Sequence, residues 1–177
     1  MTAVLAVMVI SAYLVGSIPT AYLLAQWVKH VDIRTVGSGN VGATNALRTL
    51  GAWGGLAVLV VDVLKGVLAA GAPQGLFAGA PPGLPLLVGL AAVVGHNFSC
   101  FLRFRGGKGV ATTLGVLLAS DPLIASMVIG VFLVVLAAGR YVSVGSLAAA
   151  VAIPVSQLVC HQTPLEIMIG AILAGLI

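Results

Sequence analysis

Long apolar stretches, almost free of charge, constrain the fold of this chain more than any other feature of its sequence. Apolar side chains make up 60% of its 177 residues, and Asp, Glu, Lys and Arg together make up 7%. A soluble domain normally carries about 25% charged residues, so this composition excludes a soluble globular fold and a disordered chain. The sequence therefore predicts an all-α polytopic membrane protein. No polar linker divides residues 1–177, which we expect to form one integral membrane domain.

The apolar pattern predicts about seven transmembrane helices, some of them short. A helix needs about 20 apolar residues to cross the hydrocarbon core of a bilayer. We expect the spans over residues 2–28, 53–70, 84–102, 110–119, 123–138, 144–160 and 165–177. Asp121 followed by Pro122 marks a turn between the fourth and the fifth span. The last stretch is half a span, so we expect a truncated final helix.

The basic residues predict the orientation of these spans. Seven of the eight Lys and Arg residues fall in residues 29–52, in residues 103–109 or at Arg140, which all lie on one side of the predicted bundle. The alternate connections hold no Lys or Arg. Loops rich in Lys and Arg face the cytoplasm, so we expect the N-terminus outside and these three segments inside. Membrane lipids account for the positive net charge, and no basic run with interleaved aromatic residues indicates nucleic-acid binding.

The first basic segment contains a glycine-rich polar run. Residues 37–42, the first glycine loop, read Gly37-Ser38-Gly39-Asn40-Val41-Gly42, and Ala43-Thr44-Asn45-Ala46-Leu47-Arg48 follow. Successive backbone N–H groups in such a run can cradle phosphate oxygens. We expect residues 43–48 to form a short helix whose N-terminus favours an anion, with Arg48 as a bidentate donor. The alternative is a flexible polar loop. The spacing matches neither a Walker motif nor a dinucleotide fingerprint.

Two further inner segments repeat this combination of glycine or serine with a cation. Residues 103–109, the second glycine loop, read Arg103-Phe104-Arg105-Gly106-Gly107-Lys108-Gly109 and lead directly into the short fourth span. Lys108 is a candidate anion ligand, whereas Arg103 is better explained as a basic flank of the membrane span. After Arg140, the serines Ser143 and Ser146 are candidate site residues or helix caps. His96, near the inner end of the third span, is a candidate ligand or a packing residue.

Two ionisable residues lie inside the predicted second span. Asp62 and Lys65 are three residues apart, so they share one helix face and can neutralise each other. A structural ion pair and a catalytic role are equally open, and we expect Lys65 to extend towards the outer interface. The inner loops offer Asp32 as their single carboxylate, so the sequence predicts no metal site and no cofactor.

Taken in order, these motifs resemble the bacterial acyl-phosphate:glycerol-3-phosphate acyltransferases of the PlsY family. The resemblance covers residues 37–48, 62–66, 95–98, 104–112 and 140–143. It implies a seven-helix enzyme of the bacterial inner membrane, active at the cytoplasmic face in phospholipid biosynthesis. Such an enzyme transfers a fatty acyl group from acyl phosphate to the sn-1 hydroxyl of glycerol 3-phosphate, giving lysophosphatidic acid and phosphate. An upstream enzyme that forms acyl phosphate is a candidate partner.

The resemblance also implies the roles of particular residues. Ser38, Arg48 and Lys108 would be catalytic and hold glycerol 3-phosphate, while backbone amides around Thr44 and Asn45 would take the acyl phosphate. The substrate-binding residues expected with them are Gly39, Asn40, Gly42, Thr44, Asn45, His96, Gly106, Gly107, Gly109, Ser143 and Ser146. Whether Ser143 or Ser146 lines the site stays open. The family carries a further motif with His, Asn and Glu after its last helix, and the residues up to Ile177 hold no counterpart.

The alternative function is a small transporter of an anionic solute. A transporter would have polar residues spread through its spans on both sides of the membrane midplane. Here the polar residues concentrate at one end of the predicted bundle, which favours an interfacial enzyme. A purely structural membrane subunit would leave both glycine loops and their cations unexplained.

Overall fold

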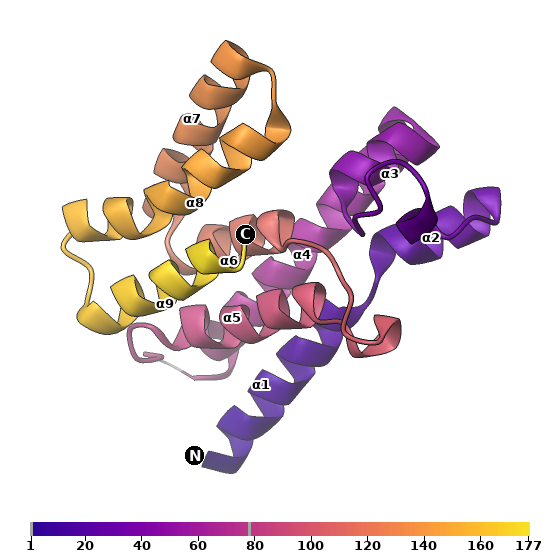
Figure 1. The fold of residues 1–177 in the computed structure, drawn as a ribbon. Helices are drawn as coiled ribbons and strands as arrows, with labels where there is room; N and C mark the ends of the chain where they lie inside the picture. The colour runs from indigo at the N-terminus through magenta and orange to yellow at the C-terminus, as the bar shows by residue number, and fades with distance from the viewer. Residues whose placement is uncertain (1, 78) are drawn as a thin grey trace.

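The computed structural model describes residues 2–77 and 79–177, and these residues form a bundle of helices joined by loops and short turns (Figure 1). The α-helices are α1 (Thr2–Ser17), α2 (Thr20–Lys29), α3 (Ala43–Leu50), α4 (Ala52–Leu76), α5 (Leu84–Asn97), α6 (Val110–Ser120), α7 (Pro122–Gly139), α8 (Val142–Val159) and α9 (Pro164–Gly175). Two 3₁₀ turns, η1 (Ile33–Thr35) and η2 (Cys100–Leu102), lie in the connections.

The expected all-α membrane architecture is confirmed. In the described residues, five segments are long and apolar enough to cross a bilayer: Thr2–Lys29, Ala52–Leu76, Leu84–Leu102, Pro122–Gly139 and Val142–Val159. The two remaining apolar helices, α6 and α9, are shorter, as the sequence predicts. The turn between α6 and α7 is also confirmed, because the Asp121 carboxylate caps α7 by accepting hydrogen bonds from Leu123 N and Ile124 N.

The first span differs from the expected single helix, because it breaks between α1 and α2. Pro19 follows Ile18 at the break, and α2 leaves at an angle to α1 (Figure 1). Proline has no N–H to continue a helix, so carbonyls of the preceding turn need other partners. The hydroxyl of Ser99 donates to the Ser17 carbonyl at 2.5 Å, and the Lys65 ammonium donates to the Ile18 carbonyl at 2.6 Å.

Glycines let the central helices approach each other at backbone distance. On α6, the position where Gly115 would carry a Cβ atom is occupied by the Val63 carbonyl of α4, and Gly66 of α4 meets the Thr112 carbonyl in the same way. Gly95 of α5 lies against the Tyr13 carbonyl of α1. Small residues are the usual device for close helix packing in membranes, where apolar burial itself contributes little.

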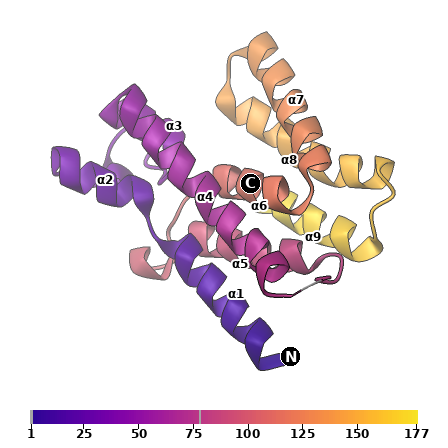
Figure 2. The same ribbon diagram turned by 180° about the vertical axis from the view of Figure 1, so that it is seen from behind.

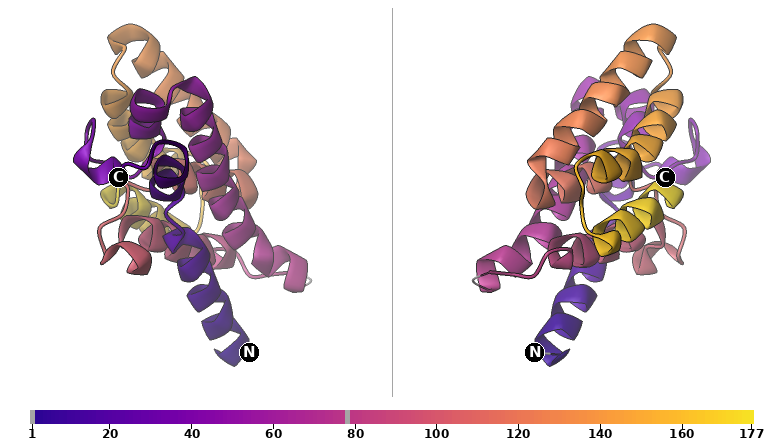
Figure 3. Two further views of the ribbon diagram at one scale, coloured as in Figure 1. Left: turned by 90° about the vertical axis from the view of Figure 1, so that its right-hand side faces the viewer. Right: turned by 90° about the vertical axis from the view of Figure 1, so that its left-hand side faces the viewer.

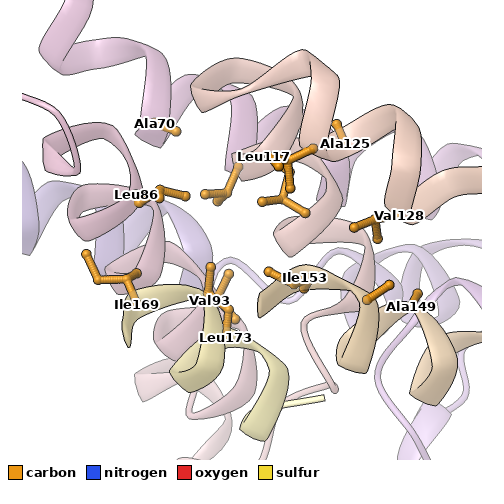
Figure 4. Packing of buried hydrophobic residues seen from close by; sticks show 13 residues of the cluster. Ala70, Leu86, Val93, Leu117, Ala125, Val128, Ala149, Ile153, Ile169 and Leu173 are labelled. Carbon is orange, nitrogen blue, oxygen red and sulfur yellow. The ribbon is translucent and has the colours of Figure 1, made fainter. Parts of the chain in front are cut away.

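Besides a small cluster that packs α1 against α4 and α5 (Met8, Ala12, Ala69, Val88 and Ala92), two apolar clusters hold the bundle and the glycine loops. The larger one joins α4 to α9 and includes Ala70, Leu86, Val93, Leu117, Ala125, Val128, Ala149, Ile153, Ile169 and Leu173 (Figure 4). The smaller one packs α2 and the first glycine loop against α4, through Ala21, Ala25, Ile33, Val41, Ala46, Val58 and Leu102. α3 packs on the smaller cluster through Ala46.

The helices that flank the first glycine loop, α2 and α3, and the α7–α8 turn lie on different sides of α4, and α3 and this turn are both at the end of the bundle away from the N-terminus (Figures 1 and 3). α2 and α3 project from one side of α4, and the turn between α7 and α8 projects from the other, in both front and back views (Figures 1 and 2). The free end of α1 points away from both projections, and α9 packs beside α8 (Figure 3).

The close packing of α4 against α6 gives a testable prediction. Gly115→Ala places a methyl group on the Val63 carbonyl, so we expect it to separate the two helices and to lower stability by about 1–3 kcal/mol. Gly130→Ala on α7 is the matched control, because an added methyl there meets nothing within 4 Å. Thermal unfolding of both variants in detergent measures the difference, and equal melting temperatures would contradict the packing described.

Candidate active site

Asn45 organises the first glycine loop. Its side chain is fully buried, and its carbonyl oxygen accepts a hydrogen bond from Ser38 N at 2.9 Å. Its amide nitrogen donates to the carbonyls of Ile33, Val36 and Asn40 at 3.0–3.1 Å. One side chain therefore closes the loop onto the start of α3.

Glycine is required where this loop meets Asn45. Gly37 has φ +60°, and the Asn45 side-chain oxygen lies where a Cβ atom of residue 37 would be. Before the loop, Asp32 caps η1 and pairs with Arg34 at 2.6 Å. The hydrogen bonds from Arg34 lower the pKa of the Asp32 carboxyl, so this pair stays charged at neutral pH.

The helix expected after the loop is confirmed as α3, which carries Thr44 in its first turn and Arg48 on an exposed face. The first amides of a helix have no carbonyl partner within it, so they are available to an anion. Ser38 is exposed at the loop's outer edge, and Asn40 is half-buried.

The second glycine loop folds back onto the end of α5. Gly106 N donates to the Asn97 carbonyl at 2.9 Å, and Gly107 N donates to the His96 carbonyl at 3.0 Å. Gly109 has φ +69° and caps the start of α6, with the Asn97 side-chain oxygen 2.7 Å from where its Cβ would be. Lys108 is exposed between these anchored glycines.

The two glycine loops meet at Gly107. A Cβ atom on Gly107 would lie 2.6 Å from the Val41 carbonyl in the first glycine loop, and it would also overlap His96 Nε2. Val41 lies two residues before the start of α3, and Gly107 lies three residues before the start of α6. The contact therefore brings the segments that lead into two helices, more than sixty residues apart in the chain, next to each other. Lys108 follows Gly107 directly, whereas Arg48 lies in the last turn of α3.

The carboxylates that the structure describes do not neutralise Arg48 and Lys108. Each of the four carboxylates has a structural partner: Asp32 pairs with Arg34, Asp62 pairs with Lys65, Asp121 caps α7 and Glu166 caps α9. Within residues 2–77 and 79–177, Arg48 and Lys108 take part in no salt bridge, and no three His, Cys, Asp or Glu side chains form a metal-binding group. Arg48 and Lys108 can thus bind a phosphate without first breaking an ion pair.

Three candidates from the sequence have different surroundings from those expected. The Asn45 side chain is engaged by the loop itself, so its contribution to substrate binding is limited to its backbone. His96 is 9% exposed and lies between Asp62 and Gly107 rather than facing the surface. Lys65 does not extend to the outer interface, because its ammonium is buried against Asp62 and Ile18.

The serines of α8 are not joined to the glycine loops. Ser143 is exposed, and the Ser146 hydroxyl donates to the Val142 carbonyl of its own helix at 2.9 Å. In the described part of the chain, no side-chain hydrogen bond links either serine to residues 37–48 or 103–109. The start of α8 stands apart from α3 in Figures 1 and 2.

A cavity of about 360 Å³ lies away from these loops, at the end of the bundle where α4, α5, α6 and α9 meet. Its polar lining includes Gln74, Asp121, Gln157, Gln162 and Glu166, and none of the site residues expected from the sequence borders it. The exposed cations expected to bind an anion, Arg48 and Lys108, instead lie outside this cavity.

Comparison with known proteins agrees with this geometry. The family model described as "Glycerol-3-phosphate acyltransferase" matches residues 6–177. The chain belongs to the glycerol-3-phosphate acyltransferase family. Among curated relatives, the glycerol-3-phosphate acyltransferase of Rippkaea orientalis is 45% identical over 98% of this chain and 84% of its own. That of Desulforudis audaxviator is 50% identical over 88% of this chain and 78% of its own.

A solved structure of this family has the same fold. The crystal structure of PlsY, an integral membrane glycerol 3-phosphate acyltransferase, in its glycerol 3-phosphate form superposes with a TM-score of 0.90. It is 38% identical, and the match covers 97% of this chain and 85% of that one. The lysophosphatidic acid form of PlsY gives a TM-score of 0.87 at 37% identity. The chain is thus an integral membrane member of the glycerol-3-phosphate acyltransferase family.

The role of Asn45 can be tested directly. Asn45→Ala removes four hydrogen bonds from a buried amide, and we expect it to lower stability by about 2–4 kcal/mol, at about 1 kcal/mol each. Gln74→Ala is the control, because that amide makes one exposed hydrogen bond of 3.4 Å. We expect the control to stay within about 0.5 kcal/mol of the parent. Unfolding in detergent gives both values, and a neutral Asn45→Ala would refute the loop's dependence on this side chain.

Proposed function

We propose that this protein transfers a fatty acyl group from acyl phosphate to the sn-1 hydroxyl of glycerol 3-phosphate, forming lysophosphatidic acid and phosphate. The observation that carries the proposal is the contact between the two glycine loops at Gly107 and Val41, near two exposed cations, Lys108 and Arg48, that form no salt bridge within the described residues. Two adjacent anion-binding loops suit a reaction in which both substrates carry a phosphate.

In this proposal, Ser38, Arg48 and Lys108 hold glycerol 3-phosphate. The backbone amides of Gly42, Thr44 and Asn45 receive the acyl phosphate, and the amide of Gly109 completes the second loop's anion site. Gly39, Gly106 and Gly107 line the site without offering their amides, because these donate to the carbonyls of Val36, Asn97 and His96. Arginine is suited to this task because its planar fork can donate two hydrogen bonds to one phosphate.

The chemistry needs little more than positioning. The sn-1 oxygen attacks the acyl carbonyl carbon, a new ester bond forms, and the bond from that carbon to the phosphate oxygen breaks. Phosphate leaves with the bonding electrons, and the hydroxyl proton passes to a substrate phosphate. Correct placement of the two reactants contributes up to about 7–11 kcal/mol. Cations and amides aimed at the carbonyl and the departing phosphate stabilise the developing negative charge.

The relatives support the same substrate and product. PlsY has been crystallised in a glycerol 3-phosphate form and in a lysophosphatidic acid form, and its fold is shared over 97% of this chain. The transporter alternative receives no comparable support from the relatives. We therefore retain acyl transfer as the proposed function.

We further propose that the site faces the cytoplasm at the inner membrane of a bacterium, with the N-terminus outside. Seven of the eight basic residues lie in the segments that would be inside, which supports this orientation. Trp27 and Trp53, beside the first glycine loop, are 81% and 82% exposed, as is usual for side chains at a membrane–water interface. Acyl phosphate would then reach the site from the lipid layer, supplied by an upstream enzyme.

The proposed roles of the two cations predict a clear loss of activity. Arg48→Gln and Lys108→Gln each remove one phosphate ligand, and we expect kcat/KM for glycerol 3-phosphate to fall by about 100-fold or more. The measurement follows labelled glycerol 3-phosphate and palmitoyl phosphate to lysophosphatidic acid with purified protein. Arg103→Gln is the matched control, because this exposed arginine lies outside the glycines of the same loop.

The parent enzyme's product decides between the two functions. Lysophosphatidic acid formation that survives both substitutions would contradict the site assignment. Uptake of a phosphate-bearing solute into proteoliposomes without product formation would favour the transporter.

The orientation is tested by chemical labelling. Thr35→Cys places a thiol at an exposed position before the first glycine loop, in a background with Cys100 and Cys160 changed to Ala. We expect a membrane-impermeant maleimide to label this thiol in inverted vesicles and to leave it unlabelled in intact spheroplasts. The reverse pattern would place the glycine loops outside.

A further inference from the structure

A buried charged pair on α4 has no role in the reaction described above. Lys65 Nζ lies 2.6 Å from Asp62 Oδ1, and the two side chains are 4% and 2% exposed. Burying an ion pair costs more desolvation than apolar residues of the same volume, so stability alone is a weak explanation for it. The pair contacts two segments that support the glycine loops: the break between α1 and α2, and the end of α5 at His96.

The first segment is the break between α1 and α2. Lys65 Nζ donates to the Ile18 carbonyl at 2.6 Å, and the Thr20 hydroxyl donates to Asp62 Oδ1 at 3.2 Å. The pair therefore binds the last carbonyl before Pro19 and the first residue of α2. Since α2 packs under the first glycine loop, the angle of the break sets where that loop stands.

The second segment is the end of α5 at His96, which borders the second glycine loop. His96 Nδ1 lies 3.9 Å from Asp62 Oδ1. The other ring nitrogen, Nε2, lies against Gly107, where a Cβ atom would overlap it, and Gly107 in turn touches the Val41 carbonyl. The contacts thus run from Lys65 through Asp62 and His96 to the point where the glycine loops meet.

Residues 97–99, which follow His96, also connect the first span to the second glycine loop through hydrogen bonds. The Ser99 hydroxyl donates to the Ser17 carbonyl at 2.5 Å, and Tyr13 Oη donates to the Phe98 carbonyl at 2.8 Å. On its other side, this corner accepts the Gly106 and Gly107 N–H groups. The broken first span and the second glycine loop are therefore both attached to residues 96–99.

We propose that Lys65, Asp62 and His96 are positioning residues that fix the spacing between the two glycine loops. They do not touch the substrates. They hold Gly107 against Val41, so that Lys108 and the start of α3 can bind the same substrate. This role rests on the proposed function for its kinetic consequence, whereas its effect on the order of the second glycine loop does not depend on any substrate.

Two variants test the proposal. The double variant Asp62→Asn, Lys65→Met removes both charges together, so no uncompensated charge remains buried. The second variant, His96→Gln, keeps a polar side chain of similar length. Gln157→Met on α8 is the matched control, because it replaces another buried polar residue, 2% exposed, that is remote from the glycine loops.

The first measurement is amide hydrogen exchange of the purified proteins in detergent. We expect exchange in residues 104–109 to accelerate by about tenfold or more in both variants, because the Gly106 and Gly107 hydrogen bonds open more often. Exchange in α7 and α8 should stay at the parent rate. In the control variant, residues 104–109 should exchange as in the parent.

The second measurement separates KM from kcat and records the pH profile. We expect KM for glycerol 3-phosphate to rise by about ten- to 100-fold, more than KM for acyl phosphate, because the displaced loop carries Lys108. The conservative His96→Gln should lose less activity than His96→Ala. The shape of the pH–rate profile should not change, since a positioning residue transfers no proton.

The outcomes are distinct. Unchanged exchange and unchanged KM in either folded variant would overturn the proposal, and so would loss of one limb of the pH profile in His96→Gln, which indicates proton transfer. If the double variant fails to fold, His96→Gln alone decides. A parent protein that forms no lysophosphatidic acid refutes the proposed function instead, and the exchange result still stands or falls by itself.

Discussion

Inside a bilayer, every backbone carbonyl and N–H needs a partner within the protein, and the broken first span shows how far that requirement shapes this fold. Pro19 ends α1 early and leaves the Ser17 and Ile18 carbonyls without helical partners. Ser99 donates to the Ser17 carbonyl, and Lys65 adds a second donor to the Ile18 carbonyl, which also accepts from Thr20 N. The break lets α2 turn aside, and the room beside α4 is then filled by the first glycine loop and α3.

The distribution of charge also reflects the need for every buried or structural polar group to have a partner. All four carboxylates are engaged in holding the fold, two in ion pairs and two at helix N-termini. Arg48 and Lys108 therefore have no carboxylate partner within residues 2–77 and 79–177 that would compete with a phosphate. An anion that binds there gains the full attraction of Arg48 or Lys108, and helix N-termini add to it. The carboxylates of the protein thus stabilise its fold, whereas Arg48 and Lys108 remain available to a ligand.

Much of the fold was predictable from the sequence, because hydropathy and turn residues act locally. The spans, the turn at Asp121 and the helix after the first glycine loop follow from composition and spacing alone. The break at Pro19 also had a signal, since proline interrupts an otherwise apolar run. The spacing of Asp62 and Lys65 allowed for their ion pair, but the second partner of Lys65 had no signal, because it is a backbone carbonyl 47 residues away. Asn45 likewise has the chemistry of a ligand, and only its burial shows that it closes the loop.

The glycines explain why the loops need an inner support at all. Gly37, Gly107 and Gly109 allow the backbone to approach other groups at distances that any side chain would prevent. The same freedom raises the conformational entropy that must be lost when the loops become ordered. Asn45 offsets that loss in the first loop with four hydrogen bonds. In the second loop, two backbone hydrogen bonds and the contact of Gly107 with the buried His96 ring offset this loss. The rigidity of the second loop therefore depends on the position of His96, and hence on Asp62 and Lys65 next to it.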